Sequence, residues 1–317
     1  MKVLLTGVAG FIGSHVAERL LLGGHRVVGL DSFDPFYPRT VKERNLRRAL
    51  DDPDFTLIEA DIRDREALRA IPSDVDAIIH MAALAGVRPS ILDPAAYMDV
   101  NVAGTGALLD LARDVGVRRF VFASSSSVYG EREKGPFRED DPVDHPISPY
   151  AATKKAGELI AHTYHHLFGL DVLCLRFFTV YGPRQRPDLA IHKFARLMAS
   201  GQPIPVYGDG STERDYTYVD DAVSGVLGAL AHLEERRGVY DVVNIGESRT
   251  VSLSEMIALL AAELGVRPVL DRQPDQPGDV PLTCADVSRA RRLIGYDPRF
   301  PFEEGVRRFV EWFRSET

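Results

Sequence analysis

Cysteine is scarce in this sequence, with Cys174 and Cys284 the two examples among 317 residues. Their separation and the absence of CxxC spacing exclude the dense disulfide framework of a small secreted domain. We therefore expect a reducing environment, for which the cytoplasm is the simplest location.

Long apolar runs and an excess of positive charge are also missing. No apolar stretch approaches the length of a membrane span, and glycine interrupts the N-terminal MKVLLTGVAGF too early for a signal peptide. The 38 Lys and Arg residues are outnumbered by 46 Asp and Glu residues, for a net charge of −8. Nucleic-acid binding needs clustered cations in excess. We expect neither a membrane nor a nucleic-acid partner, whereas a small anionic ligand needs only a local cationic pocket.

What the sequence does contain is a series of short, continuous apolar runs separated by longer segments of helical period. The runs lie at residues 2–6, 26–31, 55–60, 76–82, 118–124 and 171–178. Continuous rather than alternating apolar strands indicate a parallel sheet covered on both faces. We predict an α/β protein with a Rossmann-type doubly wound parallel sheet.

The composition changes at Thr179, after which Pro, Gly and charged residues become frequent, as in GQPIPVYGDGSTERDY. Such segments are typical of loops that cover the carboxyl ends of parallel strands. We predict a cofactor-binding domain at residues 1–178, with part of 217–247 returning to it, and a smaller substrate-binding lobe formed mostly by 179–317.

A dinucleotide motif lies at the first strand-to-helix junction, where TGVAGFIGSH places Gly7, Gly10 and Gly13 at GxxGxxG spacing. Glycines there allow a tight turn, an approach of backbone N–H groups to a pyrophosphate, and close helix packing. The next strand ends in Asp31, whose carboxylate would accept the ribose hydroxyls and repel a 2′-phosphate. No arginine follows it, so NAD is favoured over NADP.

Other residues near strand ends are predicted to contact the cofactor. Asp61 could reach the adenine amino group or could be the N-cap of the following helix, and both readings stay open. The further predicted cofactor contacts are Phe11, Ile12, Ser32, Ile62, Met81, Ala82, Ala83 and Phe177.

A candidate acid/base pair follows in SPYAATKKAGE, where Tyr150 and Lys154 lie one turn apart on the first turns of a helix. A tyrosine with a pKa of about 10 is a poor base at neutral pH. A nearby ammonium and a positively charged nicotinamide both favour its phenolate. Behind a dinucleotide motif, the pair predicts proton transfer coupled to hydride transfer.

Together with the serine run in ASSSSVYG, these motifs resemble the extended short-chain dehydrogenase/reductase superfamily. The resemblance to its nucleotide-sugar branch covers the whole chain, including RDYTYVDD and PGDV. It implies a catalytic triad of Ser125, Tyr150 and Lys154, with Asn101 supporting it and contacting the cofactor. The implied reaction is oxidation of a sugar 4-hydroxyl by NAD, rotation of the 4-keto sugar, and reduction on its other face.

The residue before VYG separates reactions within this branch. Sugar dehydratases of the superfamily typically have glutamate there, and nucleotide-sugar decarboxylases often do, whereas this chain has Ser127. Because dehydration needs a carboxylate to remove a proton from carbon 5, the sequence favours epimerisation.

The segments MAALAGVRPSI and RFFTVYGPRQRPD resemble UDP-glucuronate 4-epimerases more than the glucose/galactose type, which typically has asparagine in place of Thr179. Arg186 offers a bidentate partner for a sugar carboxylate, with Thr179, Ser126 and Ser127 around it. We hypothesise that these four hold the carboxylate away from the geometry in which a 4-keto-uronate loses carbon dioxide. Arg186 could instead be a surface or pyrophosphate contact, and Arg88 is a competing anion ligand.

The resemblance also implies a nucleotide end. The backbone of an extended strand at Pro205 to Tyr207, which includes Val206, would pair with a uracil edge. Arg214 would reach the diphosphate, and Asp279 would bind the ribose. Gln276 stands where the glucose epimerases have arginine, so the diphosphate charge would rest mainly on Arg214.

Several alternatives remain open. A UDP-glucose/galactose 4-epimerase, a UDP-glucuronate decarboxylase and a catalytically silent NAD-binding regulator are the other candidate functions. The clustered His162, His165 and His166 lack a carboxylate or cysteine to complete a metal site, so we expect no metal. Residues 91–116 and 150–169 resemble the helix pair that forms homodimers in the superfamily.

Overall fold

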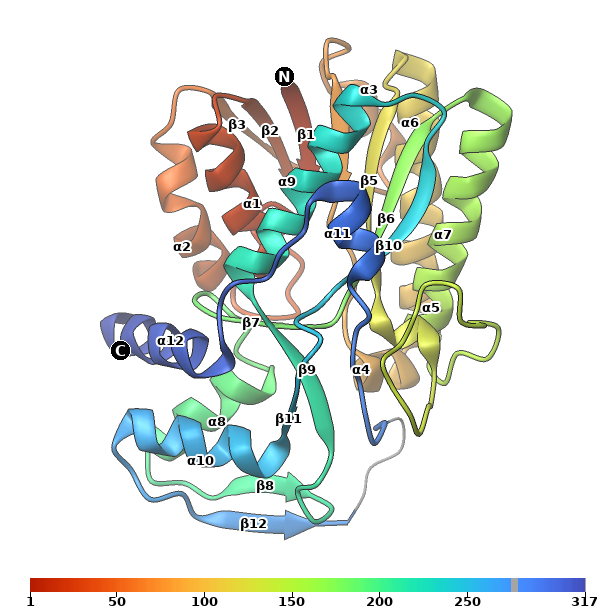
Figure 1. Cartoon of the computed structure of the whole chain (residues 1–317). Coiled ribbons are helices and arrows are strands. Elements are labelled where there is room, and N and C mark those ends of the chain that lie inside the picture. Colours follow the sequence, from red (N-terminus) through yellow and green to blue (C-terminus); the bar gives the residue numbers. More distant parts are fainter. Residues whose placement is uncertain (275–278, 317) are drawn as a thin grey trace.

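The computed structural model of the chain describes residues 1–274 and 279–316, which form a larger and a smaller part (Figure 1). Within these residues the larger part contains seven parallel strands in the order β10-β6-β5-β4-β1-β2-β3. They are β1 (Lys2–Thr6), β2 (Arg26–Asp31), β3 (Phe55–Glu59), β4 (Ala77–His80), β5 (Arg119–Ser125), β6 (Asp171–Phe177) and β10 (Tyr240–Ile245). The strand order runs outward from β1 in both directions, which confirms the predicted doubly wound sheet.

Helices cover both faces of this sheet. On one face α1 packs against α2 and α9, and on the other α6 packs against α3 and α7, with α4, α5 and a π-helical turn beside α7. Their bounds are α1 (Phe11–Leu22), α2 (Arg39–Leu50), α3 (Arg65–Arg69), α4 (Val87–Leu92), α5 (Pro94–Met98), the π-helix (Asp99–Ala103), α6 (Gly104–Val115), α7 (Pro149–Phe168) and α9 (Val219–Glu235).

Each face of the sheet buries its own apolar core, because successive side chains of a strand point to opposite sides. On β1, Val3 and Leu5 join the core that contains Val16 of α1. Leu4 joins the core that contains Leu108 of α6. Strands buried on both sides need apolar residues at every position, which explains the continuous runs in the sequence.

The smaller part lies beyond the carboxyl ends of the large sheet and appears below it in Figure 1. It contains a three-stranded sheet in the order β11-β9-β7 and a parallel pair, β12 and β8. The elements are β7 (Thr179–Tyr181), α8 (Ala190–Ala199), β8 (Ile204–Tyr207), β9 (Glu213–Tyr218), β11 (Thr250–Ser252), α10 (Leu253–Leu264), β12 (Leu270–Gln273) and α12 (Phe302–Glu316).

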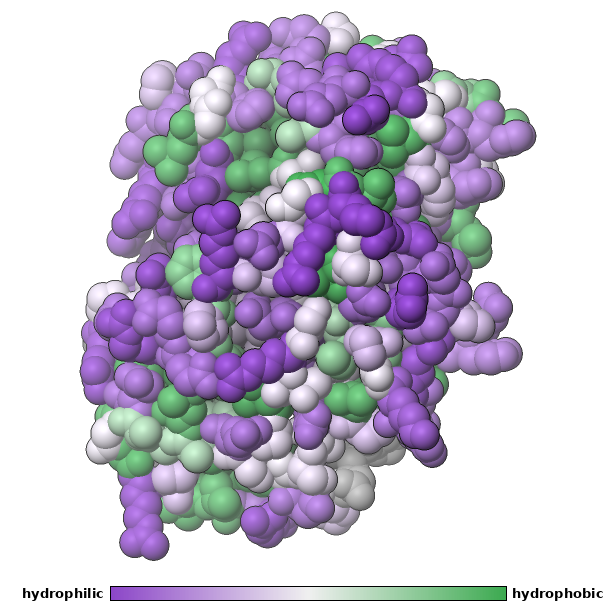
Figure 2. Space-filling model, in the orientation of Figure 1, coloured by the Kyte–Doolittle hydropathy of each residue, from purple (hydrophilic) through white to green (hydrophobic). Residues whose placement is uncertain are grey.

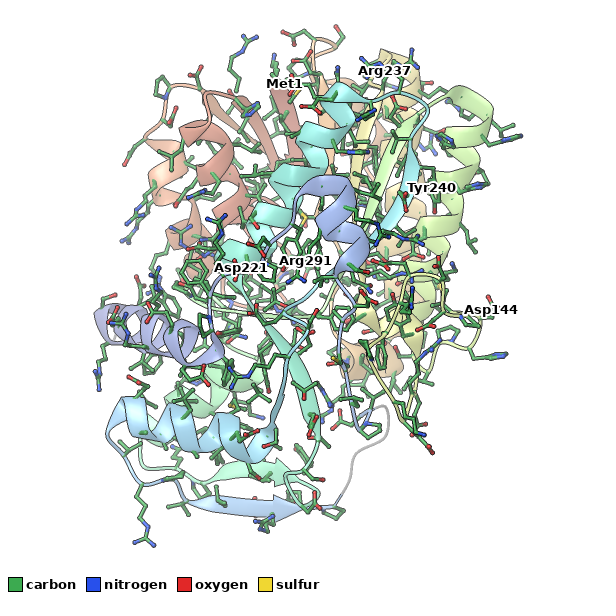
Figure 3. The ribbon with its side chains drawn as sticks, viewed as in Figure 1. Met1, Asp144, Asp221, Arg237, Tyr240 and Arg291 are labelled. Atoms are coloured by element: carbon green, nitrogen blue, oxygen red, sulfur yellow. The ribbon has the colours of Figure 1, made fainter. Side chains whose placement is uncertain are left out.

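The chain returns to the larger part after β9. Helix α9 packs on β5 and β6, and β10 becomes the edge strand beside β6, where α11 (Ser288–Ile294) packs against both α9 and β10. Tyr240 on this edge strand faces α7 and donates to the backbone carbonyl of Glu158 at 2.9 Å (Figure 3). The loop-rich half of the sequence therefore also supplies a strand and two helices to the larger part.

Hydrophilic residues cover most of the face shown in Figure 2, and apolar residues form small separate patches on it. Among the described residues, no helix combines the length and the hydropathy that crossing a bilayer requires.

Candidate active site

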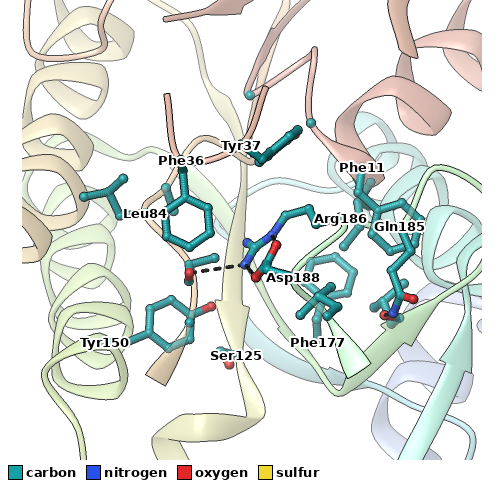
Figure 4. Close-up of a pocket in the computed structure, with 18 of the residues that line it drawn as sticks. Phe11, Phe36, Tyr37, Leu84, Ser125, Tyr150, Phe177, Gln185, Arg186 and Asp188 are labelled. Atoms are coloured by element: carbon teal, nitrogen blue, oxygen red, sulfur yellow. Dashed lines mark hydrogen bonds and ion pairs between the residues drawn. The ribbon is translucent and has the colours of Figure 1, made fainter. Parts of the chain in front are cut away.

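A cavity of about 660 Å³ lies between the carboxyl ends of the large sheet and the smaller part (Figure 4). Ligands of open α/β sheets bind at this edge because the strand-to-helix loops converge there. Its size suits a cofactor and a small substrate. The cavity brings together predicted residues from both halves of the sequence.

The glycine turn between β1 and α1 forms one wall. Gly7 has a φ of +70°, and a Cβ there would lie 2.7 Å from the backbone nitrogen of Ala82. A Cβ on Gly13 would lie 2.1 Å from the carbonyl oxygen of Gly7. Larger residues would therefore force the turn away from α1. The glycines themselves leave backbone N–H groups of the turn and of the α1 N-terminus open to the cavity, and a helix N-terminus binds pyrophosphate well.

Asp31 ends β2 at the same wall and is 6% exposed. Its carboxylate accepts hydrogen bonds from the backbone N–H of Ala9 at 3.0 Å and of Phe33 at 2.8 Å. Lys42 of α2, which the sequence analysis missed, places its ammonium 3.7 Å from the carboxylate. The same ammonium lies over the Tyr37 ring at 4.9 Å, so this cation is already engaged.

Most of the other predicted cofactor contacts also line the cavity. They are Gly10, Phe11, Ile12, Ser32, Asp61, Ile62, Met81, Ala82, Ala83 and Phe177.

Asp61 is paired with Arg63 at 2.7 Å, which lowers the pKa of the carboxyl. The N-cap of α3 is Asp64, whose carboxylate accepts from the backbone N–H groups of Glu66 and Ala67. The reading of Asp61 as this N-cap is therefore wrong.

Asn101 lies behind the cavity wall rather than on it. Its side chain is buried and bonds the backbone N–H and carbonyl of Leu84 at 2.8 and 2.9 Å. It also donates to the Thr153 hydroxyl at 3.0 Å, and that hydroxyl bonds the carbonyl of Tyr150. These bonds place Asn101 where it supports Leu84 and α7, and its predicted contact with the cofactor stays a prediction.

Tyr150 and Lys154 project from the first turns of α7 into the cavity. The helix starts there because Ser148 caps it, accepting from the N–H of Ala151, and Pro149 occupies its first position. The Lys154 ammonium donates to the carbonyl of Ala123 on β5 at 2.7 Å and lies 5.9 Å from the center of the Tyr150 ring. One helical turn therefore sets their spacing.

Burial governs the ionisation of both groups. It raises the pKa of Tyr150, while a hydrogen bond with Ser125 and the charge of Arg186 oppose the rise. It lowers the pKa of Lys154 to about 7. This differs from the expected lowering of the Tyr150 pKa, because desolvation outweighs the hydrogen bond with Ser125 and the charge of Arg186. A further positive charge in the cavity would favour the phenolate.

Ser125 ends β5 on the cavity wall, near Tyr150 in Figure 4. Its hydroxyl donates to that of Ser127 at 3.1 Å and accepts from the Ser127 N–H at 3.2 Å. Ser126 and Ser127 begin a 3₁₀ turn (Ser126–Tyr129), where both are half-buried but do not line the cavity. The strand ends between Ser125 and Ser126, so Ser125 stays on the cavity wall while the next two serines leave it.

Arg186 reaches into the cavity from the loop after β7, and Thr179 at the start of β7 also lines the cavity. Its guanidinium binds Asp188 at 3.0 Å and 2.7 Å through Nε and Nη2, and Nη2 lies 3.5 Å from the carbonyl of Ala85. Phe36 lies against the guanidinium at 5.0 Å (Figure 4). The predicted anion ligand is thus in place, and an internal carboxylate already holds one of its edges.

At the far end of the cavity Arg88 pairs with Asp279 at 2.7 Å and lies over the Tyr207 ring at 4.9 Å. Arg214 lines the same end. Val206 does not, because alternation along β8 turns its side chain into the core, where it is 2% exposed. The predicted contact Gln276 lies outside the described residues.

Sequence reasoning missed several cavity residues. Phe36 and Tyr37 follow the Asp31 strand within six positions, so the loop DSFDPFY at a strand end was the available signal. No sequence pattern marked Lys42 as a cavity residue, because it lies on α2, whose basic residues are typical of a solvent-exposed helix face. Gln185 and Asp188 flank Arg186 in the same loop.

The central strand of a doubly wound sheet ends here in a glycine turn, and a tyrosine and a lysine line the same cavity. This combination defines a dinucleotide-dependent enzyme of the short-chain dehydrogenase/reductase type. Sequence comparison assigns it further. Residues 3–246 match the NAD dependent epimerase/dehydratase family, and the chain belongs to this family.

The relatives are similar along almost the whole chain. A UDP-glucuronate 4-epimerase of Thermodesulfobacterium geofontis is 41% identical over 315 residues, covering 98% of this chain and 96% of the relative. The crystal structure of UDP-glucuronic acid 4-epimerase from Bacillus cereus with UDP-glucuronic acid and NAD is 35% identical, covers 100% of both chains and has a TM-score of 0.93. A dTDP-glucose 4,6-dehydratase from Streptomyces venezuelae is also 35% identical, with a TM-score of 0.91 over 99% of this chain and 97% of that one. Overall similarity therefore does not separate the reactions, and site residues must.

Proposed function

We propose that this protein is an NAD-dependent UDP-sugar 4-epimerase that interconverts UDP-glucuronate and UDP-galacturonate. The observation that carries the proposal is the presence of Ser125, Tyr150 and Arg186 on the walls of one cavity. The first two suit a sugar hydroxyl and the third suits a carboxylate. The relatives that are UDP-glucuronate 4-epimerases support the same assignment.

The residues fit NAD. The turn around Gly7, Gly10 and Gly13 would hold the pyrophosphate, and Asp31 would accept the adenosine-ribose hydroxyls. NAD bound there would supply the hydride acceptor and donor for carbon 4 of the sugar. Because Lys42 is paired with Asp31, the ribose would meet a carboxylate and not a free cation. The carboxylate disfavours a 2′-phosphate.

Tyr150 would move the proton of this reaction. Its phenolic oxygen takes the proton from the sugar 4-hydroxyl during oxidation and returns it during reduction. Ser125 shares the same hydroxyl and orients it. Lys154, held by the Ala123 carbonyl, supplies positive charge beside the tyrosine.

Arg186 and Thr179 would hold the sugar carboxylate. A 4-keto-uronate is a β-keto acid and loses carbon dioxide when its carboxylate stands perpendicular to the ring carbonyl. These two contacts on the cavity wall would keep the carboxylate out of that orientation. Ser126 and Ser127, which do not line the cavity, would support them through the turn that Ser125 caps. This restraint favours return of the hydride over decarboxylation.

The nucleotide would occupy the other end of the cavity. Arg214 would meet the diphosphate, Asp279 the ribose and Tyr207 the uracil, with Arg88 beside them. We propose the corresponding division of labour, with residues 1–178 and the returning elements holding NAD and the rest of 179–317 holding the nucleotide sugar.

We also propose that the protein is a cytoplasmic homodimer that pairs through α6 and α7. Cys174 and Cys284 are both free thiols, which suits a reducing compartment. Leu159 and Leu167 of α7 are 56% and 67% exposed and lie two helical turns apart on one face. A Leu159→Glu variant that sedimented as the same species as the wild type would contradict this interface.

The function is tested by incubating the purified protein with NAD and either UDP-glucuronate or UDP-glucose and following products by NMR. We expect UDP-galacturonate from the first, and kcat/KM about 100-fold lower for the second, because UDP-glucose has no carboxylate to contact the Arg186 guanidinium beside Asp188. Turnover of UDP-glucose alone would favour the glucose/galactose epimerase. Pentose as the main product would favour the decarboxylase, and no turnover of either sugar would favour the non-catalytic regulator.

A further inference from the structure

A buried ion pair lies behind the serine turn. Arg176 of β6 and Glu158 of α7 have side chains that are 2% and 1% exposed. The guanidinium donates through Nε to Oε1 at 2.8 Å and through Nη2 to Oε2 at 2.9 Å. Because both charged groups are removed from water, the pair is favourable only with this close two-pronged geometry.

This pair holds the turn at its start. The Ser124 hydroxyl donates to Oε1 of Glu158 at 2.7 Å. Ser124 directly precedes the proposed catalytic Ser125, and its other neighbour, Ala123, accepts from Lys154 at 2.7 Å. The end of β5 is therefore tied to α7 at two successive residues.

The same pair holds the turn at its end. The Arg176 guanidinium lies over the Tyr129 ring at 4.9 Å. The Tyr129 hydroxyl donates to the Asn244 side chain at 2.7 Å, which ties the ring to β10 as well. Ser125, Ser126 and Ser127 lie between these two anchors.

Helix α7 links these anchors to the reacting group. Glu158 follows Tyr150 by two helical turns and Lys154 by one, so all three belong to one rigid element. Moving the glutamate would move the serine turn relative to the phenolic oxygen. The Tyr240 hydroxyl bonds the Glu158 carbonyl at 2.9 Å and fixes the helix against the sheet edge at the same level.

Stability alone does not explain such a pair, because well-packed apolar residues of similar volume are as stabilising as a buried ion pair or more so. What apolar residues cannot supply is an acceptor for Ser124 and a cation for the Tyr129 ring.

We propose that Glu158 and Arg176 are positioning residues that set where the hydroxyls of Ser125, Ser126 and Ser127 stand relative to Tyr150 and the sugar. The inference rests on the proposed function and extends it to product choice. A loosened turn would let the 4-keto-uronate carboxylate rotate. The bond between carbons 5 and 6 would then break, its electron pair would pass to the carbon 4 oxygen as an enolate, carbon dioxide would leave, and carbon 5 would be protonated. The product of that route is a UDP-4-keto-pentose.

The test compares Ser124→Ala with a Glu158→Leu/Arg176→Met double variant that removes the pair at similar volume. Thr163→Ala is the matched control, since its exposed hydroxyl on the same helix bonds only the Ile160 carbonyl. UDP-glucuronate turnover is followed by NMR, together with kcat, KM and NAD binding. We expect both test variants to lose about tenfold in kcat and to raise the ratio of decarboxylated to epimerised product about tenfold, with KM within about twofold. Thr163→Ala keeps the wild-type values.

Folded test variants with the product ratio and kcat of Thr163→Ala would overturn the inference. If the double variant does not fold, Ser124→Ala and Tyr129→Phe, which releases the Asn244 anchor, decide in its place, and an unchanged ratio in both is again a negative result. A wild type inactive on UDP-glucuronate would refute the uronate assignment alone. The kcat of the same variants on UDP-galactose would then confirm or contradict positioning.

Discussion

Arg186 and Asp188 form a two-pronged ion pair within the cavity, with the guanidinium Nε and Nη2 at 3.0 and 2.7 Å from the two carboxylate oxygens. The arginine that would bind a sugar carboxylate therefore has one edge filled already. The pair orients the guanidinium, while the fixed negative charge repels an incoming anion.

Asp188→Asn should raise the preference for an anionic sugar. Removing a like charge beside the substrate carboxylate should increase the ratio of kcat/KM for UDP-glucuronate to that for UDP-glucose about five- to tenfold. The ratio is measured with both sugars under one set of conditions. Asp34→Asn is the control, since Asp34 lines the same cavity without pairing with Arg186. Equal ratios in the two variants would show that Asp188 has no part in selectivity.

Tyr150→Phe should remove the proton acceptor and leave the packing intact. We expect kcat to fall by about 10²- to 10⁴-fold with NAD binding unchanged. Tyr97→Phe is the matched control, because its ring packs edge-on against Tyr150 at 6.2 Å and its hydroxyl only donates to the Ala85 carbonyl. A Tyr150→Phe enzyme as active as Tyr97→Phe would exclude Tyr150 as the acid/base.

Asp31→Asn should weaken NAD binding and relax the choice between NAD and NADP. The variant loses a charged acceptor for the ribose hydroxyls and frees the Lys42 ammonium, 3.7 Å away, to meet a 2′-phosphate. We expect the Kd for NAD to rise about tenfold and the affinity for NADP to improve, both measured by titration calorimetry. Glu59→Gln, at the end of the neighbouring strand and outside the cavity, should change neither. Unchanged affinities in Asp31→Asn would remove this residue from the cofactor site.

Glu247 should make the protein less stable as pH rises. Burial and the charges of Asp221 and Asp215 raise the pKa of its carboxyl from 4.5 to about 8, against the opposing charges of Arg249 and Arg291. Between these two pKa values the folded chain keeps a proton that the unfolded chain has lost, so the free energy of unfolding falls as pH rises through that window.

Glu247→Gln should abolish this loss. Since the residue is only partly buried, we expect a gain of about 1–2 kcal/mol at pH values above about 8 and almost none near pH 4.5. Thermal unfolding across this range measures it, with the exposed Glu235→Gln as control. Parallel pH profiles for Glu247→Gln and the wild type would contradict the prediction.

Much of the site was predictable because its parts are close in sequence. The GxxGxxG turn and the Tyr150–Lys154 pair each lie within one local element, whose backbone geometry sets their spacing. Asp31 was predictable for the same reason, as the last residue of a strand. Asn101 and Val206 stand in the expected elements without lining the cavity, and their predicted contacts stay predictions. Asn101 lies beside Leu84 of the cavity wall, whereas the Val206 side chain lies in the core.

Contacts between distant segments were not predictable in this way. The sequence around Asp31 does not predict its contact with Lys42, which the packing of α2 on α1 creates. The sequence around Ser124 likewise does not predict its contact with Glu158 or the nearby Arg176, because the packing of α7 on β5 and β6 brings these side chains together. The sequence by itself determined the doubly wound sheet, its glycine turn and its acid/base pair, since hydrophobic period and local spacing specify them. The tertiary structure alone decided which serines of the run line the cavity, which charges are already paired, and what holds the serine turn against Tyr150. These depend on the directions of side chains carried by separate packed elements.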